Sequence, residues 1–160
     1  MTFASGHDAR FAGLVRRMDS QSRLQRAWTL GGGISAQVTA LEVKEPNGNL
    51  RRLIVRQHGA GDLKRNPQVA ADEFRVLAAL HSAGLPVPAP VFLDESREFF
   101  DTPVLVVEYI DGETVITGQN LAGILSQSAA VLAKLHNMSV DTLDLPRLPR
   151  IDLGVTGLHS

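Results

Sequence analysis

Residues 30–57 read LGGGISAQVTALEVKEPNGNLRRLIVRQ, and this stretch carries the clearest secondary-structure signals of the chain. It holds two segments rich in β-branched and other apolar residues, at 34–44 and 51–57, which are typical of strands. Between them stands Asn47-Gly48, a strong hairpin signal because both turn residues tolerate positive φ. The stretch therefore predicts two consecutive antiparallel strands, preceded by three glycines.

The segments on either side of this hairpin add further helices and strands. Apolar residues at intervals of three and four predict helices over about 8–23 and about 119–138. Another helix should begin after Asn66, with Pro67 in its first turn, and end before Gly84. Three more strands are expected, at 24–30, 90–94 and 103–109.

The order of these elements is helix, three strands, helix, two strands, helix. Strands joined mostly by hairpins, with one helix inserted after the third, predict an α+β fold rather than parallel βαβ units. We therefore expect an antiparallel five-stranded sheet with an inserted helix, followed by a C-terminal helix.

The composition excludes several classes of protein. The chain has 160 residues, of which 44% are hydrophobic and 21% are charged, and these are ordinary values for one globular domain. It has no cysteine, which excludes a disulfide scaffold, a thiolate metal site and a cysteine nucleophile. The sequence shows neither a secretory signal nor an apolar run of about 18 residues, so we expect a cytoplasmic protein without a membrane partner.

Charge is divided unevenly along the chain. Residues 1–65 carry 11 basic and 5 acidic side chains, a balance of +6, whereas residues 66–160 carry 5 and 12, a balance of −7. A basic half attracts a polyanion such as a nucleotide, although a solvated surface explains the same count. Aromatic residues are not interleaved with the basic ones and no nucleic-acid motif is present, so we expect no nucleic-acid partner.

The three glycines allow more than one interpretation. Gly31 to Ala36 satisfies the dinucleotide pattern G-x-G-x-x-A, but that pattern has to open a helix, and here it leads into a hairpin. A dinucleotide-binding domain is therefore the weakest alternative. Glycines between paired strands instead suggest a flap whose N–H groups approach phosphates, while a plain glycine turn remains open.

Glu73 is the most informative residue of the chain. It stands in the middle of an apolar helical stripe, where a carboxylate is costly unless it is paired. Strand alternation places Ile54 and Arg56 on one face of the sheet, which makes Arg56 the natural partner. The alternatives are that Glu73 reaches solvent at the stripe edge and that Arg56 lies at an exposed strand end. The stripe consists of Val69, Val76, Leu77 and Leu80.

Five segments in this order resemble a known family. A glycine flap, a strand cation and a helix glutamate resemble the small lobe of the protein-kinase-like fold. The local sequence most resembles that of the aminoglycoside phosphotransferase family, which are the small-molecule kinases of that fold. The resemblance covers about residues 24–145 and rests on LGGGISAQVTALEV, RRLIVRQHG, AADEFRVLAALHSAGLPVPAPVFLDE, DTPVLVVEYIDGETV and LAGILSQSAAVLAKLHNMSV.

This resemblance implies ATP-dependent phosphorylation of a hydroxyl on a small molecule, with Mg²⁺ bridging the phosphates. Arg56 would hold the phosphates and be oriented by Glu73, and the glycine segment would cover them. The backbone of Glu108, Tyr109 and Ile110 would meet adenine, with Ile54 packed on the face of the base. The nucleotide-binding residues implied are Gly31, Gly32, Gly33, Ser35, Ile54, Arg56, Glu73, Glu108, Tyr109 and Ile110.

The chain departs from the family pattern in its second half. The family's large lobe carries a His-x-Asp catalytic loop, and no histidine here is followed two residues later by Asp. Residues 151–154, with Asp152, look like the metal-binding segment, but without a catalytic loop before them we assign them to a linker-like tail. We therefore expect no catalytic residue and no metal ligand in this chain. The resemblance implies that residues 1–110 are the small lobe, and we expect 111–160 to be the hinge, the first large-lobe helix and the tail, with the large lobe missing.

Two rival functions and one assembly follow from this pattern. The chain is either the ATP-binding lobe of such a kinase, inactive alone, or a non-catalytic module that binds a nucleotide or a protein. The C-terminal helix carries an apolar stripe that the large lobe would cover, so we expect a homo-oligomer unless the helix folds back on its own sheet. The stripe consists of Leu121, Ile124, Leu125, Leu132 and Leu135.

Overall fold

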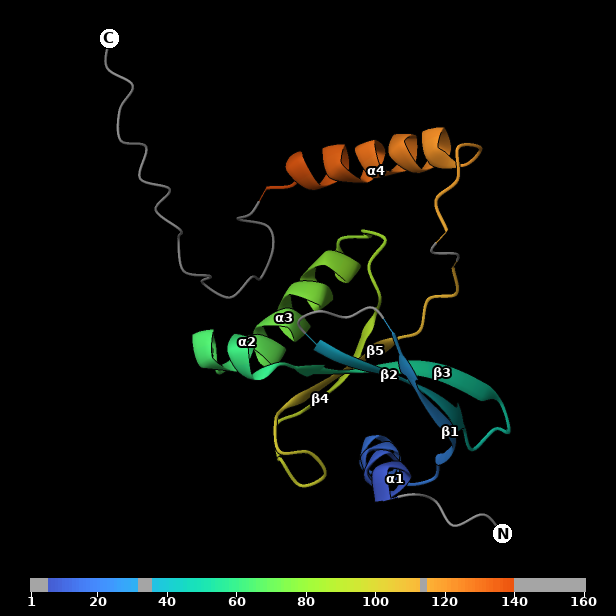
Figure 1. Ribbon diagram of the computed structural model, residues 1–160, viewed down its shortest axis with the longest axis vertical. Helices are drawn as coiled ribbons and strands as arrows, with labels where there is room; N and C mark the ends of the chain where they lie inside the picture. Colours follow the sequence, from blue (N-terminus) through green and yellow to red (C-terminus); the bar gives the residue numbers. More distant parts are fainter. Residues whose placement is uncertain (1–5, 32–35, 113–114, 140–160) are drawn as a thin grey trace.

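The computed structural model describes residues 6–31, 36–112 and 115–139 (Figure 1). Its centre is a five-stranded antiparallel sheet in the order β1-β2-β3-β5-β4, which confirms the predicted α+β class. The strands are β1 (Arg23–Leu30), β2 (Ala36–Lys44), β3 (Leu50–His58), β4 (Pro90–Asp94) and β5 (Val104–Glu108). The helices are α1 (Gly6–Met18), α2 (Ala60–Arg65), α3 (Val69–Ser82) and α4 (Leu121–His136).

The β2–β3 hairpin forms at the predicted turn. Gly48 has φ of 87°, and its N–H donates to the carbonyl of Glu45 at 2.9 Å. The Asn47 side-chain oxygen accepts from the N–H of Asn49 at 2.9 Å. Because strand β2 follows the glycine segment where the dinucleotide pattern requires a helix, the dinucleotide-binding alternative is wrong.

The hydrophobic core lies between one face of the sheet and α1, the helix drawn below the sheet in Figure 1. Phe11, Leu14 and Val15 of α1 are fully buried, which agrees with their predicted helical stripe. Burial of each such side chain contributes on the order of 1.5–3 kcal/mol. They pack against alternate residues of three strands and one loop aromatic: Leu41, Val43, Leu53, Val55, Val104, Val106 and Phe100.

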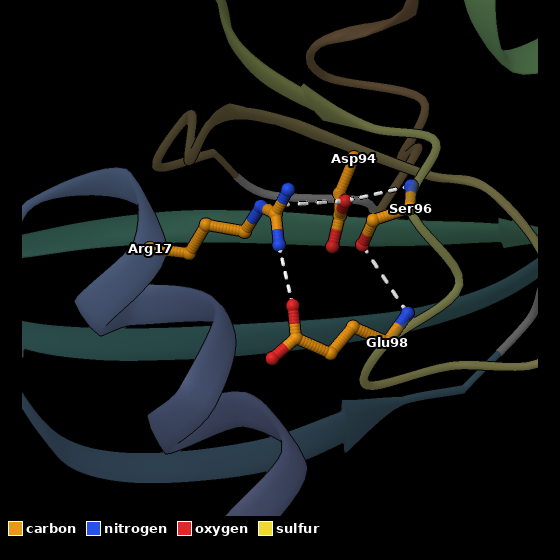
Figure 2. Close-up of polar contacts among 4 residues, drawn as sticks. All are labelled: Arg17, Asp94, Ser96 and Glu98. Atoms are coloured by element: carbon orange, nitrogen blue, oxygen red, sulfur yellow. Dashed lines mark hydrogen bonds and ion pairs between the residues drawn. The ribbon is translucent and has the colours of Figure 1, made fainter.

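Polar contacts also join α1 to the end of β4 and to the segment that follows it (Figure 2). Arg17 donates from Nη1 to Oε2 of Glu98 at 2.6 Å, and its Nε lies 3.7 Å from Oδ1 of Asp94. Asp94 is buried, and its Oδ1 accepts a hydrogen bond from the N–H of Ser96 at 3.0 Å. Ionic contacts of Arg17 with Asp94 and Glu98 therefore help to hold the C-terminal end of α1 against the sheet.

Two helix boundaries differ from the predictions. α1 ends at Met18 and not near residue 23, because the Asp19 side chain accepts hydrogen bonds from Gln21 and Ser22 and turns the chain into β1. α3 begins at Val69, and Asn66 does not cap it. The Asn66 side-chain oxygen instead accepts from the N–H of Gln68, in a turn before the helix.

Helix α2 was not predicted. It has six residues and none of them is buried, so its sequence lacks the regular spacing of apolar residues from which a helix is predicted. The end of α3 does follow the prediction, since Gly84 has φ of 72° directly after the helix.

Helix α4 stands apart from the sheet (Figure 1). None of its residues is buried, and Lys134 Nζ donates to the carbonyl oxygen of Gly84 at 2.6 Å. The helix therefore does not fold back on its own sheet. Within the described ranges no helix is long and apolar enough to cross a bilayer. The predicted tail, with Asp152, lies outside the described residues.

Candidate functional site

The site is built on the face of the sheet opposite the core, which α3 partly covers and which we call the α3 face. Directly paired residues of antiparallel strands share a face. The register aligns Val38 with Arg56, and Arg56 with Leu105, in one row across the sheet. The neighbouring row runs through Trp28, Ala40, Ile54 and Val107. Ile54 and Arg56 therefore share this face, as strand alternation predicted.

The ion pair between Arg56 and Glu73 is present. Arg56 Nη1 on β3 lies 2.5 Å from Glu73 Oε1 on α3, so the carboxylate in the apolar stripe finds the predicted partner. The side chains are 36% and 21% exposed, which reduces the strength of the pair below that of a fully buried one. The Nε of Arg56 is buried and makes no hydrogen bond among the described residues. Because Nε is shut off from solvent, the donors for an incoming anion have to come from the exposed part of this guanidinium.

His58 joins this pair, although the sequence analysis did not single it out. It is the last residue of β3 and is buried, and its Nε2 lies 3.1 Å from Oε2 of Glu73. The distance is that of an ion pair, but the N–H of His58 is not aligned for a hydrogen bond. The signal that points to His58 is its position two residues beyond Arg56, on the same face of the strand.

The predicted adenine-binding residues, Glu108 to Ile110, begin at the last residue of β5. The N–H of Glu108 donates to the carbonyl of Ala89 at 2.9 Å, and the N–H of Tyr109 approaches the carbonyl of Arg52 at 3.4 Å. Ile110 is exposed, and its N–H donates to no other backbone group among the described residues. A backbone donor is therefore available at Ile110.

Trp28 lies at the edge of this segment and was missed by the sequence analysis. Its ring centroid is 6.4 Å from that of Tyr109, and the Arg52 guanidinium lies 5.6 Å from the Tyr109 ring. Arg52 also donates to Asp111 at 2.9 Å. Alternation along β1 is the only sequence signal for Trp28, because the contact with Tyr109 joins residues far apart in the chain.

The glycine segment is described only in part. Gly31 is exposed, and a Cβ added there would meet no atom within 4 Å, so its surroundings do not require glycine. Gly32, Gly33 and Ser35 lie outside the described residues. The predicted phosphate flap therefore stays a prediction.

Comparison with known proteins agrees with this arrangement. Residues 29–155 match the phosphotransferase enzyme family, and the chain belongs to that family. Acyl-CoA dehydrogenase family member 10 of Mus musculus is 30% identical over 111 residues, which are 69% of this chain and 10% of that protein. A crystal structure of a candidate aminoglycoside phosphotransferase from Ralstonia eutropha JMP134 has the same fold, with a TM-score of 0.58 and 15% identity. The match covers 84% of this chain and 39% of that one, so the chain spans well under half of either relative.

Proposed function

We propose that this chain is the ATP-binding lobe of a small-molecule kinase, which transfers the γ-phosphate of ATP to a hydroxyl of a small substrate. The observation that carries the proposal is the ion pair between Arg56 and Glu73 on the α3 face. A guanidinium is suited to phosphate because its donors form a planar fork, and a carboxylate beside it restricts its orientation. Phosphoryl transfer depends mainly on such positioning and on charge stabilisation.

The α3 face offers complementary groups for the rest of the nucleotide. Ile54 and Val38 are half-buried apolar residues on this face, suited to the surface of a base. The N–H of Ile110 supplies a donor for a base edge, and Arg56 lies two residues along the strand from Ile54, toward the glycine segment. The residues present therefore fit a nucleotide whose base lies near the segment after β5 and whose phosphates lie near Arg56.

Mg²⁺ is part of the proposed reaction, where it would neutralise phosphate charge. Within the part of the chain that the structure describes, no three His, Asp or Glu side chains are grouped so as to hold a metal ion. The proposal therefore assigns no Mg²⁺ ligand to the described residues. Arg56 acts by binding phosphate, and Glu73 acts by orienting Arg56.

Trp28 provides the test, because it is the only tryptophan and lies on the α3 face. Titration of the chain with ATP should produce a saturable change in Trp28 fluorescence. Arg56→Ala should lower the affinity for ATP at least tenfold, which corresponds to about 1.4 kcal/mol of binding free energy. Arg51→Ala is the matched control, since Arg51 is an exposed residue of the same strand on the opposite face. Equal affinities of wild type and Arg56→Ala would contradict the proposal.

The rival function is a non-catalytic module that binds a nucleotide or a protein. A protein partner would bind the exposed apolar stripe of α4, which a large lobe would cover under the first function. Under either function we predict that this chain alone does not turn over ATP, because it lacks a His-x-Asp loop. A steady-state assay with a panel of small alcohols measures this. Turnover that Arg56→Ala abolishes would show that the chain contains a complete active site.

A further inference from the structure

The Glu73 carboxylate has two partners, and only one of them has a role in the proposed function. Oε1 contacts Arg56, and Oε2 lies 3.1 Å from Nε2 of His58. Both partners come from β3, two residues apart on one face, so a single side chain of α3 bridges successive positions of the strand. His58 is 8% exposed, whereas Arg56 is partly open to solvent.

Helix α3 has little apolar burial to hold it on the sheet. Only Ala70 and Ala71 of this helix are buried, and its larger apolar residues are half-buried. Small side chains contribute little hydrophobic stabilisation, because it scales with the apolar area removed from water. The contacts of Glu73 with β3 therefore matter more for the position of α3 than they would in a well-buried helix.

We propose that His58 is a positioning residue for the phosphate-binding arginine: it holds the second oxygen of Glu73 and so keeps α3 against β3 before any nucleotide arrives. A helix that moves away from the sheet takes Glu73 with it and leaves Arg56 without its orienting partner. A partner that holds Glu73 in advance lowers the cost of ordering the site, and this raises ligand affinity. The inference rests on the proposed function for its effect on ATP, but not for its effect on α3.

Two variants separate the polar contact with Glu73 from packing at this position. His58→Leu replaces Nε2, which lies 3.1 Å from Glu73 Oε2, with apolar atoms, whereas His58→Gln keeps a polar nitrogen near that place. Hydrogen–deuterium exchange over 69–82 in the ligand-free chain should be at least fivefold faster in His58→Leu than in wild type. Exchange in His58→Gln should stay within about twofold. ATP affinity from Trp28 fluorescence should fall about tenfold in His58→Leu only.

A double-mutant cycle with Glu73→Ala decides whether His58 acts through Glu73. In the Glu73→Ala background, His58→Leu should cause no further change in α3 exchange. Additive effects, or wild-type exchange in His58→Leu, would overturn the inference. Should His58→Leu fail to fold, His58→Asn replaces it, since the shorter amide stays polar but falls short of Glu73. If the wild-type chain binds no ATP, the proposed function fails, and the exchange measurements still decide the role of His58.

Discussion

At the scale of single residues, Asp19 shows how a turn changes the acidity of a side chain. Its carboxylate accepts hydrogen bonds from the Ser22 hydroxyl at 2.6 Å and from the N–H of Gln21 at 3.0 Å. These bonds, the hydroxyl first, hold the pKa of Asp19 below its ordinary value of 3.8. Because the folded-state pKa is lowered, the stabilisation is present above the ordinary pKa and is lost as pH falls through the folded value.

We predict that Ser22→Ala raises the pKa of Asp19 toward 3.8, since it removes the largest cause of the shift. A pH titration of the Asp19 carboxyl carbon by NMR measures this. Ser20→Ala is the control, because the Ser20 hydroxyl contacts the side chain of Gln21 and not Asp19. An unchanged Asp19 titration in Ser22→Ala would contradict the assignment.

At the scale of elements, the packing of α1 depends on a glycine. A Cβ at Gly13 would lie 2.6 Å from Cδ1 of Phe99, so the Phe99 ring occupies the space that a side chain would need. Gly123 of α4 is the opposite case, because a Cβ there would meet no atom within 4 Å. The two glycines allow helix propensity to be separated from packing.

We predict that Gly13→Ala destabilises the chain by about 1–2 kcal/mol. The helix gains about 1 kcal/mol of propensity, but the displaced Phe99 ring costs more than that gain. Gly123→Ala, the matched control, should gain helix propensity without a clash and leave the protein as stable or slightly more stable. Urea unfolding measures both variants, and a Gly13→Ala chain as stable as wild type would show that Phe99 moves freely.

At the scale of the whole molecule, α4 leaves its apolar stripe uncovered by the rest of the described chain. Four leucines of this stripe are between 40% and 60% exposed, and Ile124 is half-buried. An apolar surface of this kind favours association. Two copies that pair these helices about a two-fold axis would remove it from water. The leucines are Leu121, Leu125, Leu132 and Leu135.

We predict that the 160-residue chain associates with itself in a concentration-dependent way. Sedimentation velocity over a hundredfold range of concentration measures this. The double substitution Leu125→Glu and Leu132→Glu should return the chain to a monomer. Leu50→Glu is the control, since Leu50 is 61% exposed but lies at the β2–β3 hairpin. A wild-type chain that stays monomeric throughout would contradict the prediction.

The elements and one part of the site could be predicted because they depend on local patterns. Turn chemistry at Asn47-Gly48 and the alternation of 51–57 are properties of neighbouring residues, and both appear in the structure. Glu73 could be recognised because a charge within an apolar stripe conflicts with its surroundings unless a partner is present. The α+β class and the pairing of Glu73 with Arg56 were therefore determined by the sequence alone.

Only the tertiary structure decided how distant segments meet. The approach of Trp28 to Tyr109 and of His58 to Glu73 depends on strand register and on the placement of α3. Local periodicity predicts neither of these. The early end of α1 has a local cause instead: the hydrogen bonds of Asp19 with Gln21 and Ser22 compete with one more turn of helix, and apolar periodicity does not reveal them. Local conformational preferences amount to only a few tenths to about 1 kcal/mol per residue. Where a tertiary contact favours a different conformation, the tertiary contact therefore prevails.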